Sequence, residues 1–121
     1  MIILKILKSQ YFWLGIIILM GFWVRVYKID SPIADWHSWR QADTAAVTRN
    51  FIKEGFNPFV THYDDSSGVA ETPLTNLNRF RFVEFPVYNM FVYPFYLLFG
   101  VNDVYHRLVS IIFSLGSIVF V

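Results

Sequence analysis

The sequence contains no cysteine among its 121 residues. This absence excludes a disulfide framework, a thiolate metal site and a cysteine nucleophile. Charge is also sparse, because Asp, Glu, Lys and Arg together make up 16% of the chain and the formal net charge is +1. The basic residues form no stripe and the acidic residues form no block. The sequence therefore predicts no nucleic-acid partner.

Apolar side chains, in contrast, are abundant. Hydrophobic residues account for 55% of the chain and aromatic residues for 20%. Both fractions exceed the ordinary composition of a soluble domain. Together with the long apolar runs described below, this composition predicts an all-α integral membrane protein whose first partner is membrane lipid.

The first apolar run predicts a transmembrane helix over residues 9–27, with Lys8 before it and Arg25 near its end. Residues 9–24 alone would cover about 24 Å as a helix, which reaches the ~30 Å hydrocarbon core once Lys8 and Arg25 extend toward the two surfaces. A cleaved signal peptide is the alternative, but the run ends in bulky residues without a small-residue cleavage site. Lys5 and Lys8 favour a cytoplasmic N-terminus, which places the next segment outside the cytoplasm.

Two later apolar runs predict a second transmembrane helix over 85–101 and a third over 107–121. The connection between them is short, so the pair is expected to form an antiparallel hairpin with His106 and Arg107 on the cytoplasmic side. The third run is still apolar at the last residue. We therefore expect the chain to be the N-terminal fragment of a longer protein.

The polar segment 28–84 is then an external loop. Residues 35–54 predict a helix that ends at "KEGFNP", where a basic residue precedes Gly55 and Pro58. Its tryptophans suit the membrane interface, so this helix is expected to lie along the surface. Residues 56–83 show turn signals without sustained periodicity and predict an irregular loop.

The densest polar cluster is "WHSWRQADT", residues 36–44. Arg40 and Asp43 are three residues apart and are neighbours on a helix, so they could form a surface ion pair worth less than about 1 kcal/mol. In a functional interpretation, Asp43 is a partly desolvated carboxylate that accepts a proton. Arg40, Arg49 and His37 would then bind an anionic group such as a lipid phosphate.

Other polar residues have simpler interpretations. Asp35 precedes the helix and is most simply an N-cap, while Asp64 and Asp65 lie in a turn-forming stretch. Glu84 directly precedes the second predicted span, where an ionisable group usually faces a protein cavity or partner. No metal site is predicted, because His37 and His62 lack the spacing of ligands on one helix face.

The order of these parts resembles the N-terminus of the lipid-dependent glycosyltransferases of the C fold, near the protein mannosyltransferase and aminoarabinose transferase group of family 39. "TRNFIKEG" (48–55) is similar to the end of the family's external helix, and "EFPVY" (84–88) to the start of its second span. Alignment on Arg49 puts Arg40 and Gln41 where the family carries an Asp-Glu pair. The nearest carboxylate is Asp43, with Asp35 as the fallback.

The resemblance implies an enzyme that transfers a sugar, with inversion, from a polyprenyl-phosphate donor to a lipid, glycan or protein acceptor on the non-cytoplasmic face. Asp43 would be the general base, Arg40 or Arg49 would hold the leaving phosphate, and Glu84 would position the acceptor or orient the basic residues. The donor is a co-substrate, no further cofactor is implied, and the need for a divalent cation is left open. The expected location is a bacterial inner membrane.

Two alternatives remain at this point. A non-catalytic membrane protein, transporter-like or a scaffold, would use the external helix as a docking surface, although the predicted spans hold few polar residues for transport. A small anchored protein complete at 121 residues would have to end its last apolar run in lipid without a polar flank.

Overall fold

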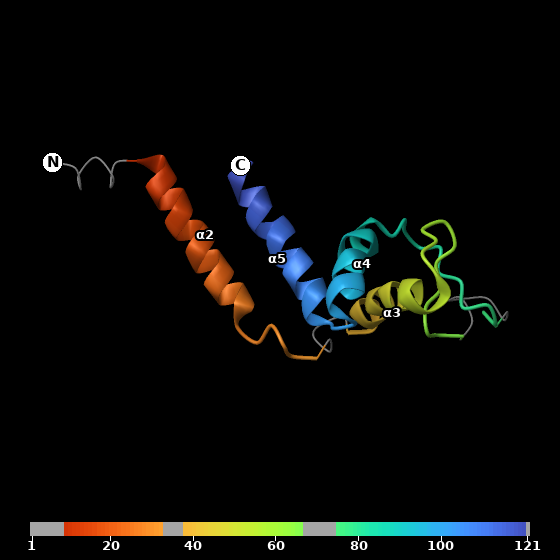
Figure 1. Ribbon diagram of the computed structural model, residues 1–121. Helices are drawn as coiled ribbons and strands as arrows, with labels where there is room; N and C mark the ends of the chain where they lie inside the picture. Colours follow the sequence, from red (N-terminus) through yellow and green to blue (C-terminus); the bar gives the residue numbers. More distant parts are fainter. Residues whose placement is uncertain (1–8, 33–37, 67–74, 121) are drawn as a thin grey trace. The chain divides into compact units, whose positions relative to one another are not determined.

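The computed structural model describes residues 9–32, 38–66 and 75–120. Within these ranges the chain forms four helices and no strand (Figure 1). The helices are α2 (Gln10–Val26), α3 (Ser38–Glu54), α4 (Val87–Phe99) and α5 (Val104–Val119). The all-helical prediction is confirmed for this part of the chain. None of its helices combines the length and the apolar character needed to cross a membrane.

The chain divides into two units, of which the first comprises Met1–Ser31 and Arg107–Val121. Helix α2 is apolar on every side and has no buried residue, so Trp23, for example, is 82% exposed. Its one charged side chain, Arg25, donates a hydrogen bond from Nη1 to the Gly21 carbonyl at 3.1 Å. Gly21 lies against Leu115 of α5, which leaves little room for a larger residue there. Most of the apolar surface of α2 therefore has no protein cover within this unit.

The second unit, Pro32–His106, is built on the packing of α3 against α4. The contact is possible because α3 presents small residues, including the buried Ala45 and Ala46, and α4 can approach closely. Asn89 of α4 donates from Nδ2 to the Thr44 carbonyl at 2.6 Å and to Thr48 Oγ1 at 2.8 Å. Buried polar groups must be paired, so these hydrogen bonds fix how the two helices align.

Helix α3 ends at Glu54 and is followed by Gly55, which has a φ of +103°, a left-handed conformation that suits glycine. The reversal brings Phe56 back against the helix, where its ring lies 5.1 Å from that of Phe51 and 4.8 Å from that of Tyr93 in α4. This aromatic contact holds the start of the loop on the α3–α4 pair. The predicted helix over 35–54 and α3 share the same C-terminal residue, and residues 35–37 lie outside the described ranges.

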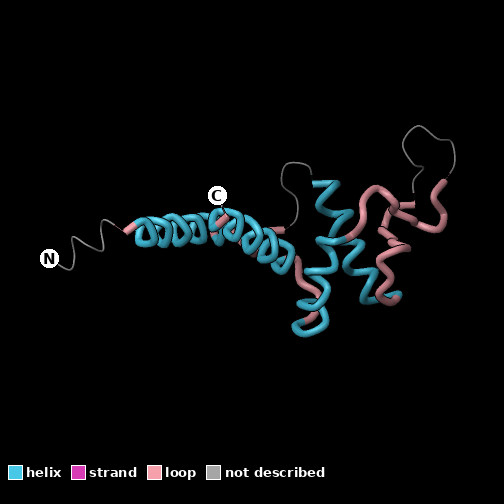
Figure 2. Tube along the Cα trace, turned by 90° about the horizontal axis from the view of Figure 1, so that it is seen from above, coloured by secondary structure: helices cyan, strands magenta, loops and turns pink. Residues whose placement is uncertain are grey.

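The loop after α3 is more regular than its sequence predicts, because two of its segments pair. His62 and Phe80 form an isolated antiparallel bridge, with Tyr63 N donating to the Arg79 carbonyl at 3.0 Å and Arg81 N to the Thr61 carbonyl at 2.9 Å. Figure 2 draws these segments as loop, in pink, beside the cyan helices. The pairing brings residues 79–81, far from α3 in sequence, alongside that helix.

Candidate functional site

The polar face of α3 carries Asp43, Asn50 and Glu54, which are separated by seven and four residues. This spacing puts the three side chains on one side of a helix. The paired loop segments lie along that side, because Arg81 reaches Asp43 and Arg79 reaches Glu54. The polar face of α3 is therefore covered by arginines from the loop, and it divides into two groups of residues.

The first group, the Asp43 cluster, comprises Arg40, Asp43, Arg81 and Glu84. Arg81 Nη1 donates to Asp43 Oδ2 at 2.7 Å, and the two side chains are only 13% and 22% exposed. Arg81 also lies over the Tyr63 ring, with its guanidinium carbon 5.2 Å from the ring centroid. A short, partly buried, charge-assisted hydrogen bond is among the stronger kinds of polar contact. Asp43 is consequently held in one orientation.

The other pair of the Asp43 cluster is looser. Arg40 Nη2 lies 3.5 Å from Glu84 Oε2, and both side chains are more than half exposed. Arg40 therefore pairs with Glu84 and not with Asp43, which differs from the surface ion pair that helix spacing suggests. Glu84 comes from the segment just before α4, so residues 44 positions apart in sequence meet at this point. The cluster combines two carboxylates and two guanidinium groups, with solvent access on the Arg40 side.

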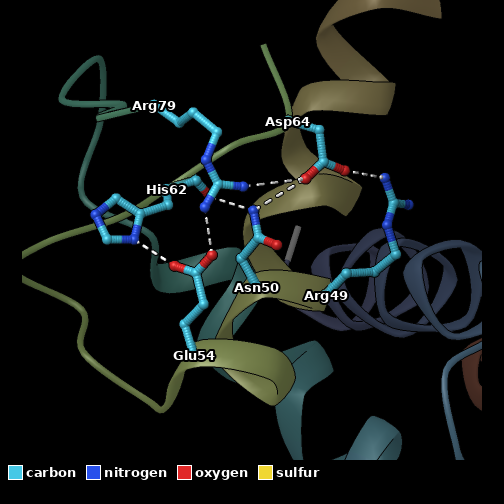
Figure 3. A network of polar contacts seen from close by, with 6 residues as sticks. All are labelled: Arg49, Asn50, Glu54, His62, Asp64 and Arg79. Carbon is cyan, nitrogen blue, oxygen red and sulfur yellow. Dashed lines mark hydrogen bonds and ion pairs between the residues drawn. The ribbon is translucent and has the colours of Figure 1, made fainter. Parts of the chain in front are cut away.

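The second group, the Asp64 network, comprises Arg49, Asn50, Glu54, His62, Asp64 and Arg79 (Figure 3). Arg49 Nη2 and Asn50 Nδ2 each donate to Asp64 at 3.2 Å. Glu54 receives Arg79 Nη2 at 2.6 Å and lies 2.5 Å from His62 Nδ1. Figure 3 shows the side chains converging from α3 and from the two loop segments. The network thus ties the loop to the C-terminal half of α3.

The pairing in the Asp64 network alters the acidity of both carboxyl groups. Hydrogen bonds from Arg79 and His62 lower the pKa of Glu54 below its usual value. Partial burial opposes ionisation of Asp64, but hydrogen bonds from Arg49 and Asn50 outweigh it and lower the Asp64 pKa as well. Both carboxylates are therefore ionised at neutral pH and already engaged, which favours a structural role.

A cavity of about 130 Å³ lies beside this network and is lined in part by Asn50, Glu54 and His62. It does not include the Asp43 cluster. Among the described residues, no three His, Asp or Glu side chains come together as a metal site requires. The described site contains carboxylates, guanidinium groups, the Asn50 amide and one imidazole.

Of the residues singled out from the sequence, the structure brings together Arg40 and Glu84, whereas Asp43 pairs with Arg81. It places Arg49 in the Asp64 network, where Nη1 also lies 3.9 Å from Asp103 Oδ1. Asp35 and His37 lie outside the described residues.

The sequence does not indicate a role for Arg79 or Arg81, and it predicts only a turn at Asp64. The available signal was the stretch "RFRF" at 79–82, in which charged and aromatic residues alternate. Such alternation is typical of an extended segment with one polar and one apolar side. Its partner segment has no matching pattern, so the pairing itself could not be foreseen.

No protein-family model, curated protein or solved structure matches this chain.

Proposed function

We propose that the chain is the N-terminal part of an integral membrane glycosyltransferase that transfers a sugar, with inversion, from a polyprenyl-phosphate donor to an acceptor on the non-cytoplasmic face. The observation that carries this proposal is the Asp43 cluster, in which Arg81 orients the Asp43 carboxylate and Arg40 pairs with Glu84 just before the apolar helix α4. A donor anchored in lipid requires reactive groups of this kind next to apolar surface.

Exposed apolar surface supports the membrane part of the proposal. Helix α2 has no buried residue, and α5 exposes Ile112 and Phe113. Large contiguous apolar surfaces are not left in water, so they mark contacts with lipid or with other protein segments. In this proposal α2 and α5 lie in a bacterial inner membrane and residues 28–84 lie outside the cytoplasm.

The Asp43 cluster can supply the groups that sugar transfer needs. The acceptor hydroxyl would donate its proton to Asp43 while its oxygen forms a bond to the anomeric carbon. The bond between that carbon and the phosphate oxygen breaks, and the lipid phosphate leaves with the electron pair. Arg40 and Arg81 can stabilise the negative charge that develops on the phosphate. Because Arg81 contacts both Tyr63 and Asp43, it would hold the phosphate in a constant position relative to the base.

The contacts of Arg49 and Glu84 suggest a role for each of these two residues. Arg40 and Arg81 belong to the Asp43 cluster, so we assign phosphate binding to them, and a positioning role to Arg49, which lies in the other network beside Asp64 and Asp103. Glu84 pairs with Arg40 and would orient its guanidinium group.

The test uses membranes that contain the full-length protein and a set of labelled polyprenyl-phosphate sugars. Consumption of one donor, with release of the lipid phosphate, is expected only in membranes that contain the protein. Membranes from a strain without the gene are the matched control. If no donor is bound or consumed in either preparation, the protein is better explained as a non-catalytic membrane protein in which α3 is a docking helix.

A further inference from the structure

Helix α4 is flanked at both ends by ion pairs to the same partner helix, α3. Before α4, Glu84 lies 3.5 Å from Arg40; after α4, Asp103 lies 3.9 Å from Arg49. Both arginines belong to α3, and all four residues belong to one unit of the structure. The two ends of α4 are therefore both within reach of a single helix.

Between its two ends, α4 packs within the same unit at successive helical turns. Asn89 is hydrogen-bonded to Thr44 and Thr48 near the start of α4, and the Tyr93 ring lies 6.1 Å from that of Phe51 one turn later. Tyr96, a further turn on, is buried in the same unit. Helix α3 thus runs beside α4, and the ion pairs are not isolated surface contacts.

These contacts are incompatible with a membrane crossing by α4. The helix has 13 residues and a length of about 20 Å, whereas the hydrocarbon core is ~30 Å thick. If α4 crossed the membrane, Asp103 would be on the opposite side from α3, separated from Arg49 by about the core thickness. A separation of 3.9 Å requires both residues to be on the same side.

The surface of α4 that faces away from α3 is apolar. Val87, Phe91 and Leu98, spaced by four and seven residues, are all at least half exposed, and Leu98 reaches 76%. The residues buried within the unit are Asn89, Val92 and Tyr96. One face packed on a polar helix and the other exposed and apolar is the pattern of a helix that lies in the plane of a membrane surface.

We infer that α4 is an in-plane helix whose outer face, Val87, Phe91 and Leu98, is embedded in the acyl region of one leaflet. A single 13-residue helix with both ends on the same side must lie along that surface. The inference depends on the membrane location in the proposed function, but not on the proposed chemistry. It replaces the predicted crossing over 85–101 and moves the turn at residues 100–103 to the same side as the external loop.

The 121 residues contain no cysteine, so a single cysteine introduced among them can be labelled without competition from another cysteine in this sequence. Asn102→Cys reports the turn after α4, Ser66→Cys reports the external loop, and Lys5→Cys serves as the opposite-side control. Each is made in the full-length protein with any other cysteine replaced by serine, and intact spheroplasts are treated with a membrane-impermeant maleimide before and after permeabilisation.

We expect Asn102→Cys and Ser66→Cys to be labelled in intact spheroplasts and Lys5→Cys only after permeabilisation. Labelling of Asn102→Cys only after permeabilisation would overturn the inference while leaving a membrane enzyme possible. If all three variants are labelled in intact spheroplasts and alkaline carbonate releases the protein from the membrane, both the inference and the membrane location are wrong.

Depth measurement provides a second test that does not depend on labelling sidedness. Nitroxide labels at Phe91→Cys and Leu98→Cys are expected at similar depths, both within one leaflet, from their relative exposure to oxygen and to a water-soluble nickel complex. These positions are separated by about 10 Å along the helix axis. A difference in depth close to that separation would show that α4 is perpendicular to the membrane and would overturn the inference.

Discussion

Arg81 is the residue on which the Asp43 cluster depends, because it holds the carboxylate and itself rests on Tyr63. Replacing Arg81 with alanine removes a charge-assisted hydrogen bond, whose loss costs about 1.5–3 kcal/mol of unfolding free energy. Arg40→Ala removes an exposed pair at 3.5 Å and should cost less than about 1 kcal/mol. Thermal unfolding of both variants in detergent checks this order. A larger loss for Arg40→Ala would contradict the described geometry.

Glu54 makes stability depend on pH. Its pKa is lowered in the folded protein by the hydrogen bonds from Arg79 and His62. The unfolded chain therefore binds the proton more readily, and Glu54 contributes stability above the ordinary carboxyl pKa of about 4.3 that is lost as the pH falls through the lower, folded value. The free energy of unfolding, measured between about pH 6 and pH 3, should fall as the pH falls. In Glu54→Gln this fall should be smaller. If the free energy of unfolding depends on pH as steeply in Glu54→Gln as in the wild type, other carboxylates cause the acid sensitivity.

At the scale of the helices, the contact between α3 and α4 contains a polar group that is costly to leave unpaired. Asn89 donates to Thr44 and Thr48, and Thr48 is fully buried. Asn89→Ala is expected to lower the unfolding free energy by about 2 kcal/mol, and Thr48→Val by about 1 kcal/mol. In the double variant the losses should be less than additive, because both single changes remove the same hydrogen bond. Strict additivity in thermal unfolding would show that the two side chains do not interact.

The helices could be predicted from the sequence, whereas the contacts that complete the site could not. Apolar runs and the Gly55 stop signal are local, and they account for the all-helical architecture of the described residues. The Arg81–Asp43 pair joins residues 38 positions apart, and it depends on how the loop folds back on α3. Long-range partners of this kind leave no local pattern, so Asp43 could be proposed from the sequence but its partner Arg81 could not.

For Arg49, the sequence did not distinguish a phosphate ligand from a structural residue. An arginine on the polar side of a surface helix suits either role. In the structure Asp64 and Asp103 both approach its guanidinium group, which supports the positioning role that we propose for Arg49.

At the scale of the whole molecule, the two units have different kinds of surface. The unit that contains α2 exposes apolar side chains on a helix without buried residues. The unit that contains α3 gathers the arginines and carboxylates into two groups beside α4. A transferase with a lipid-anchored donor needs both kinds of surface, and their presence in one chain is the basis of the account.

The measurement that tests this account most directly is the initial rate of sugar transfer from a labelled polyprenyl-phosphate donor. The full-length wild type is compared in membranes with Asp43→Asn and with Asp30→Asn, which changes an exposed carboxylate outside the cluster. Loss of a general base predicts that Asp43→Asn is slower by about two orders of magnitude, with donor binding retained and Asp30→Asn unaffected. A rate for Asp43→Asn within about threefold of wild type, at equal expression, would contradict the role of Asp43.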